Sequence, residues 1–230
     1  MLFRGAFGGG AASGKVGSVV ASHNSGGQYL RSRVTPTNTN TTFQQEVRNA
    51  IRTLSPQYAT SLTDDERLAW EVYAENVTRT NRLGDGIKIS GISTFVSFNA
   101  PRIQAGLAIL TTAPTVFDRG DAGTPATVVV GANSSDGTIT FTATDEWFAG
   151  GSLNHAFVYA SRPQNTGKSF FAGPYRLAAT IPGGGTVTAK PITLPFPAGG
   201  TLSQRIFFTY RIGRSDGRLS SSIQVSAQPT

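Results

Sequence analysis

The residues near the start of the chain that most resemble a chemical motif are 9–15, GGAASGK, which match the beginning of a phosphate-binding P-loop. In such a loop the glycines expose backbone N–H groups, and the lysine meets the β- and γ-phosphates. The match fails at Val16, where a serine or threonine must hold magnesium. The segment also opens a predicted strand, whereas a P-loop opens a helix. The sequence therefore predicts neither a nucleotide site nor a cofactor.

The two histidines, His23 and His155, carry no catalytic or metal-binding pattern. A Ser-His-Asp triad needs an activated serine, and the sequence has no G-x-S-x-G elbow to present one. Two separated histidines in a chain without cysteine do not make a recognisable metal-binding set. We predict no catalytic residue and no metal ligand, and we expect the protein not to be an enzyme.

A third candidate site combines carboxylates with aromatic residues. Asp145 and Glu146 precede Trp147, but adjacent residues of a strand point to opposite faces and do not form a catalytic pair. If they lie in a loop at a strand end, Trp147 offers a contact to a carbohydrate. With Phe170 and Phe171 it forms a possible ligand loop, and a loop acid beside a core tryptophan is the structural alternative.

The N-terminal stretch Gly14 to Arg48 carries the strongest binding pattern. Val16–Ser22 and Gln28–Val34 alternate as strands around an Asn- and Gly-containing turn, which predicts a β-hairpin. The return strand places Tyr29, Arg31 and Arg33 on one face.

The opposite face carries Leu30, Ser32 and Val34, so one side would be buried and the other would be cationic. We expect an assembly interface formed by five residues: Lys15, Tyr29, Arg31, Arg33 and Arg48. The same strip could contact nucleic acid, but one hairpin face is small for that and no Lys-rich tail or reader module accompanies it.

Helices are expected after this hairpin. An extended linker spans residues 35–41, and helices follow at about 43–54 and 64–78, forming a helical hairpin. Thr42 with Gln45, and Thr63 with Glu66, have capping-box spacing. A third helix, continuous or broken, is expected near residues 92–106.

The charge balance favours contact with anionic partners. The net charge is +7, and residues 1–52 contain six cations against the single anion Glu46. Such a surface can meet nucleic acid, anionic lipid or the acidic surface of another protein. The chain has no cysteine, no run of 18 apolar residues and no signal-peptide core at its start, so we expect synthesis in the cytoplasm and no membrane partner.

From Ala126 onward the sequence pattern changes from helical to strand-like. Seven short alternating runs are separated by Gly-, Ser- and Asp-rich turns, which predicts a β-sandwich. The expected organisation is a flexible glycine-rich arm at 1–13, a β-hairpin and helical assembly domain at 14–113, and an immunoglobulin-like sandwich at 114–230. The fold class is an α+β N-terminal domain followed by an all-β domain.

The N-terminal half resembles a widespread family of uncharacterised proteins that recurs in phages and in bacterial genomes. The pattern consists of Gly14-Lys15-Val16-Gly17, Tyr29, Arg31, Arg33, Pro36, Asn38, Thr39, Gln44, Arg48, Trp70, Ser90-Gly91 and Phe95. Many relatives carry an Asn-Pro pair in the linker, whereas here Pro36 comes first and Asn38 is followed by Thr39.

The C-terminal half resembles fibronectin type III and other immunoglobulin-like modules through the runs at 157–159, 174–176 and 216–220. Together the resemblances imply a structural protein of a phage virion, as a head decoration, neck or tail component that contacts other virion proteins and copies of itself. The alternatives are an adhesive module that binds a host surface or glycan, and a nucleic-acid-binding protein. We expect the protein in the virion, after synthesis in the host cytoplasm.

Overall fold

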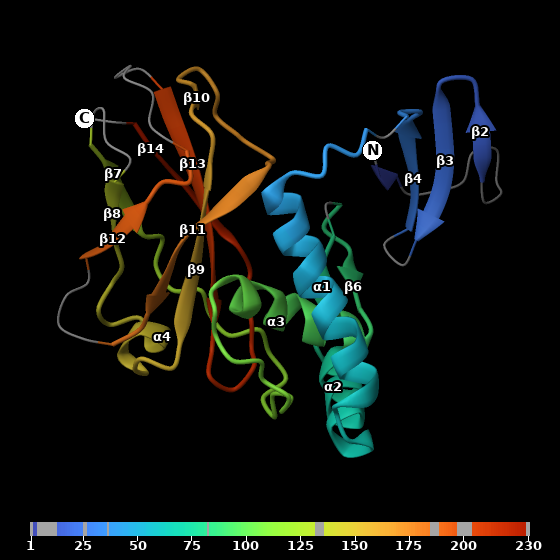
Figure 1. Ribbon diagram of the computed structural model, residues 1–230, viewed down its shortest axis with the longest axis horizontal. Helices are drawn as coiled ribbons and strands as arrows, with labels where there is room; N and C mark the ends of the chain where they lie inside the picture. The colour runs from blue at the N-terminus through green and yellow to red at the C-terminus, as the bar shows by residue number, and fades with distance from the viewer. Residues whose placement is uncertain are drawn as a thin grey trace.

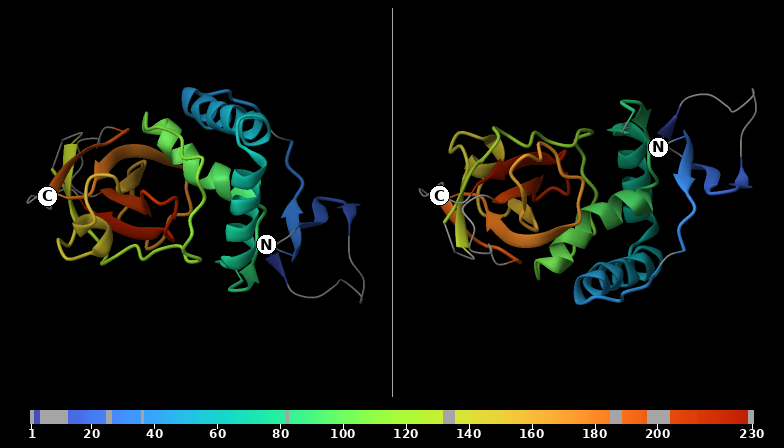
Figure 2. Two further views of the ribbon diagram at one scale, coloured as in Figure 1. Left: turned by 90° about the horizontal axis from the view of Figure 1, so that it is seen from below. Right: turned by 90° about the horizontal axis from the view of Figure 1, so that it is seen from above.

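The computed structural model describes residues 2–3, 13–24, 27–35, 37–81, 83–131, 136–184, 189–196 and 204–228. The fold is mixed α/β, with four helices in the described residues and antiparallel sheets. Three layers follow one another in space: a curled β-structure, a group of helices, and a small N-terminal sheet on the far side of the helices (Figures 1 and 2).

The N-terminal sheet is antiparallel, with strand order β1-β4-β3-β2. Its strands are β1 (Leu2–Phe3), β2 (Gly14–Val16), β3 (Val19–Asn24) and β4 (Gly27–Ser32). The predicted single strand Val16–Ser22 is wrong, because the chain turns at Gly17, whose φ of +57° favours glycine. The predicted free arm supplies β1, which pairs with β4, while residues 4–12 lie outside the described part of the chain.

Two capped helices follow the extended linker. They are α1 (Thr42–Thr60) and α2 (Asp64–Asn76). The capping box Thr63–Glu66 is confirmed at α2, and its acidic first turn suits the positive end of the helix dipole. At α1 the box is Thr41–Gln44, one residue earlier than predicted.

Helix α1 continues through Pro56, where the prediction ended or restarted it. Proline lacks the N–H of an ordinary helical residue, but the helix ends only four residues later, and the Thr60 hydroxyl donates to the Pro56 carbonyl (2.9 Å).

The third helix joins the first two. Helix α3 (Gly91–Gln104) packs against both α1 and α2, so the expected helical hairpin is a three-helix group. Trp70 is fully buried at its centre and donates from Nε1 to the carbonyl of Thr111 (2.6 Å). This hydrogen bond ties the segment after α3 to the helices.

The C-terminal strands form two facing sheets. They are β7 (Thr127–Val130), β8 (Asp136–Thr140), β9 (His155–Ser161), β10 (Gln164–Asn165), β11 (Tyr175–Pro182), β12 (Ala189–Thr193), β13 (Gln204–Gly213) and β14 (Ile223–Ala227). One sheet has the order β12-β8-β7; the other has β10-β13-β9-β11, with β14 also pairing with β13. All seven predicted runs contain a strand, and β10 is an addition.

Alternation along β9 divides its side chains between two cores. Val158 and Tyr210 point between the sheets, whereas Phe157 and Tyr159 belong to the helical cluster with Trp70. The helices therefore cover the outer face of the larger sheet, and the two halves of the chain share one apolar contact. The predicted division at 113/114 falls inside this shared region.

Candidate functional site

The cationic face of the N-terminal sheet is assembled by strand register. Lys15 pairs with Val20, and Val20 pairs with Arg31, so the two cations flank one valine on one face. Ser22 and Tyr29 are opposite each other two residues along and lie on the same face. Lys15 and Arg31 are exposed and Tyr29 is half-buried. The structure thus brings together three of the five predicted interface residues.

The opposite face of this sheet is apolar and open to solvent. Val16 pairs with Val19, and Ala21 pairs with Leu30. The side that the alternation predicts to be buried is not buried by this chain, since Val16 is 82% exposed, Val19 is 40% exposed and Leu30 is half-buried. No residue of β2, β3 or β4 is buried. Both faces of the sheet are consequently available to a partner.

The two remaining predicted interface residues lie at the linker. Arg33 follows β4, is exposed, and donates its backbone N–H to Ser18 (2.7 Å). Arg48 lies on α1, where its guanidinium donates to the side-chain oxygens of Asn38 (2.9 Å) and Asn40 (3.2 Å). Asn40 has a φ of +47°, a conformation that asparagine tolerates better than most residues. Arg48 fastens the linker to α1 instead of joining the cationic face.

A second exposed apolar surface lies along α2, and the sequence interpretation did not identify it. Leu68 (63% exposed), Val72 and Phe117 (51% exposed) line a groove of ≈ 370 Å³ with Asp65 at its edge. We call this the α2 groove. Five of the thirteen residues of α2 are acidic, namely Asp64, Asp65, Glu66, Glu71 and Glu75. The sequence carries a signal for this surface, because Leu68 and Val72 are spaced four apart and lie on one face of the helix.

The predicted ligand loop is not one site. Trp147 is 1% exposed and packs edge-on against Phe141 (ring centroids 4.9 Å apart) in the core between the sheets. The possible ligand contact through Trp147 is therefore wrong, and the alternative of a core tryptophan is confirmed. Phe170 is 67% exposed and Phe171 is half-buried, and both line a groove of ≈ 490 Å³ with Tyr175. Only the two phenylalanines can meet a ligand.

The acidic residues beside Trp147 have structural partners. Asp145 accepts hydrogen bonds from the backbone N–H and the hydroxyl of Thr124, and Glu146 pairs with Arg214 (3.1 Å). The candidate P-loop lysine, Lys15, lies in strand β2 and not at the start of a helix. Burial lowers the pKa of His155, and His23 lies in another sheet. Within the described ranges no group of three or more His, Cys, Asp or Glu side chains could hold a metal ion.

No protein-family model, curated protein or solved structure matches this chain. No helix in the described part of the chain is both long enough and apolar enough to cross a membrane.

Proposed function

We propose that this chain is a non-enzymatic structural protein of a bacteriophage virion that acts by subunit–subunit assembly. The observation that best supports this is the N-terminal sheet, none of whose β2–β4 side chains is buried although one face is apolar. A small sheet with no covering layer is marginally stable in water. A neighbouring subunit, from another virion protein or from a second copy, would supply the missing layer.

The chain itself offers a complementary surface for such a contact. The sheet presents Lys15 and Arg31, whereas α2 presents the exposed carboxylates of Asp65 and Glu75 beside exposed Leu68 and Val72. Opposite charges around an apolar centre give both orientation and burial. Docking the sheet of one copy on the α2 groove of the next is a head-to-tail contact, which closes into a ring or continues as a filament.

We further propose that the C-terminal half is a fibronectin type III-like sandwich. Its sheets, β7-β8-β12 and β11-β9-β13-β14, contain the seven strands of that architecture with antiparallel pairing. In the constant-type immunoglobulin order the fourth strand pairs with the fifth, whereas β11 here pairs with β9. Such a module would be a rigid body that the virion carries or contacts.

The experiment that tests assembly separates folding from incorporation. Deleting residues 1–35 should leave the unfolding temperature of the remainder unchanged, because none of the β2–β4 side chains contributes to a core, and should abolish self-association and incorporation into particles. Lys15→Glu with Arg31→Glu should give the same loss, while Arg52→Glu, an exposed arginine of α1, should not. Normal incorporation of the truncated chain would contradict the proposal.

Charge reversal on the other surface tests the head-to-tail contact. Asp65→Lys with Glu75→Lys should also block self-association, and mixing this variant with Lys15→Glu/Arg31→Glu should restore association between the two. If the variants do not complement each other, the sheet is covered by a different partner.

Adhesion is the alternative with a specific observation behind it, namely the exposed Phe170 over the groove at Phe171 and Tyr175. An adhesive role predicts that Phe170→Ala particles assemble normally but lose adsorption to the host. Nucleic-acid binding by the cationic face instead predicts DNA affinity that falls steeply with salt and disappears in the Lys15→Glu/Arg31→Glu variant.

A further inference from the structure

We propose that a small oxyanion such as phosphate binds between the helices and the larger sheet, held by Arg79, Arg119 and Arg211. These three arginines come from β5 (Arg79–Thr80), from the segment that enters the sandwich, and from β13. The site lies outside the N-terminal sheet and the α2 groove, and it does not depend on the proposed assembly.

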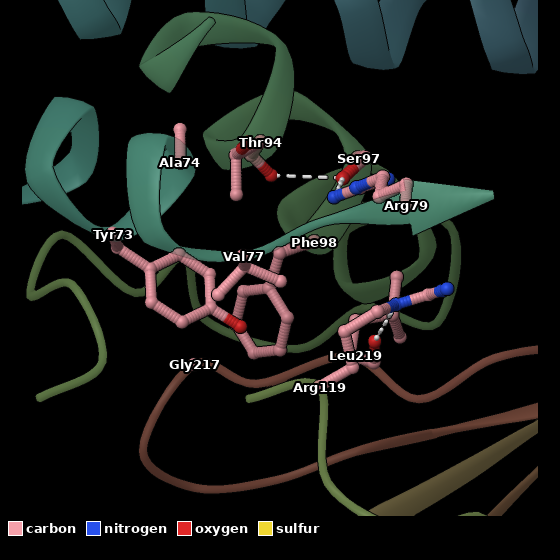
Figure 3. A pocket seen from close by; sticks show the side chains of 10 residues that line it. All are labelled: Tyr73, Ala74, Val77, Arg79, Thr94, Ser97, Phe98, Arg119, Gly217 and Leu219. Carbon is pink, nitrogen blue, oxygen red and sulfur yellow. Dashed lines mark hydrogen bonds between the residues drawn. The ribbon is translucent and has the colours of Figure 1, made fainter. Parts of the chain in front are cut away.

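Two of the arginines line a cavity that opens between the layers. Arg79 donates from Nη2 to the hydroxyl of Ser97 on α3 (2.9 Å), and Arg119 donates from Nη2 to the carbonyl of Ser220 (2.9 Å). Figure 3 shows their guanidinium groups at the same end of the cavity, away from the ring of Tyr73. The cavity walls therefore hold two cations close to one opening.

The third arginine reaches this layer from the sheet. Along β13, Tyr210 and Ile212 point into the core between the sheets, so Arg211 points to the opposite face. It is in register with Phe157, which packs in the helical cluster. The Nε of Arg211 is buried and has no hydrogen-bond partner within the described part of the chain.

Within the described part of the chain, no carboxylate forms an ion pair with any of these three arginines. The ion pairs among the described residues involve Arg67, Arg214 and Arg218, and none involves Arg79, Arg119 or Arg211. Burial lowers the pKa of Arg79 and Arg119, and burial followed by the charges of Arg119 and Arg79 lowers the pKa of Arg211 to about 10. The three guanidinium groups thus repel one another in a partly desolvated place.

An oxyanion removes this conflict. Buried charge is costly unless it is paired, and guanidinium forks match the oxygens of phosphate and carboxylate. The cavity of ≈ 10 Å³ has room for about one water molecule, so a nucleotide, a sugar or a whole phosphate ion does not fit inside it. All three arginines are partly exposed, so a single small ion can seat against them from the rim.

Calorimetric titration of the full chain with inorganic phosphate, in a phosphate-free buffer of low salt, tests the site. Wild-type protein should bind with a saturable signal that sodium chloride of equal ionic strength does not produce. Arg211→Gln and Arg79→Gln should each lower the affinity about tenfold or more, because each removes a charge-assisted hydrogen bond. The control Arg205→Gln, on the same strand β13 but bonded to the carbonyl of Lys168, should bind as wild type does.

Thermal unfolding gives a second test, because phosphate should reverse the sign of the difference in unfolding temperature between Arg211→Gln and wild type. Without phosphate, Arg211→Gln should unfold at the same temperature as wild type or higher, because it relieves repulsion. With saturating phosphate, wild type should unfold at the higher temperature of the two. The proposal is overturned if phosphate and chloride act alike on wild type, or if both arginine variants keep wild-type affinity.

Discussion

Glu71 should be one of the most sensitive single positions in the helical group. Its Oε1 accepts a hydrogen bond from the Tyr58 hydroxyl of α1 (3.1 Å), and its Oε2 accepts one from the backbone N–H of Gly91 (2.8 Å), the first residue of α3. A carboxylate beside the N-terminus of α3 also interacts favourably with the positive end of that helix dipole. Replacing Glu71 by alanine removes links to both neighbouring helices at once.

The expected cost follows from these two bonds. Hydrogen bonds to a charged group contribute about 1.5–3 kcal/mol each, and partial exposure of Glu71 reduces the sum. We expect Glu71→Ala to lower the free energy of unfolding by about 2–4 kcal/mol. Glu75→Ala, one turn later and exposed, should change it by no more than about 0.5 kcal/mol.

Urea unfolding followed by tryptophan fluorescence measures both variants, because Trp70 is buried in the same cluster. A double-mutant cycle with Tyr58→Phe should show a coupling of about 1 kcal/mol between Tyr58 and Glu71. If Glu71→Ala costs no more than Glu75→Ala, or if the cycle is additive, Glu71 does not join the helices as argued.

Three further predictions concern the rest of the fold. Trp147→Ala should lower the free energy of unfolding by about 3–5 kcal/mol, because the ring is fully buried. Phe170→Ala should leave it within about 0.5 kcal/mol of the wild-type value, and equal effects of the two variants in thermal unfolding would contradict this. Burial raises the pKa of Tyr73 from 10.0 to about 12, so the stability that its neutral phenol supports is complete below pH 10 and is lost as the pH rises through 12. Tyr73→Phe should flatten this decline of stability in alkaline unfolding curves, and an unchanged decline would argue against it. The guanidinium of Arg176 lies 3.7 Å from the ring centroid of Phe43 and holds the start of α1 on β11. Arg176→Ala should therefore raise hydrogen exchange in the first turn of α1 and lower the free energy of unfolding by about 0.5–2 kcal/mol. Unchanged exchange in that turn would refute the contact.

Local features of this chain could be predicted because their causes are local. The capping box at Thr63 and Glu66 needs only the spacing of two side chains, and it forms where the sequence places it. The seven C-terminal strands follow from alternation and turn residues. The box at Thr41 was missed by one residue because Thr41 and Thr42 both precede a glutamine three positions on.

The candidate sites were less predictable, because partners distant in sequence decide them. Trp147 was a candidate for a surface ligand loop, with a core tryptophan as the alternative, and the core between the sheets encloses it. Arg48 was predicted to belong to the assembly interface, but in the structure its guanidinium donates to two linker asparagines. Nothing local connects Arg79, Arg119 and Arg211, which come near one another only because the helices pack on the outer face of the larger sheet.

The sequence by itself determined most of the longer helices and strands, the cationic N-terminal strand and the charge imbalance, since periodicity and composition act within a few residues. The tertiary structure decided which surfaces are covered. It placed the helices over Phe157 on β9 and left Val16 and Leu68 in solvent. The physical reason is that apolar alternation specifies a face to be buried but does not specify whether this chain or a second one buries it.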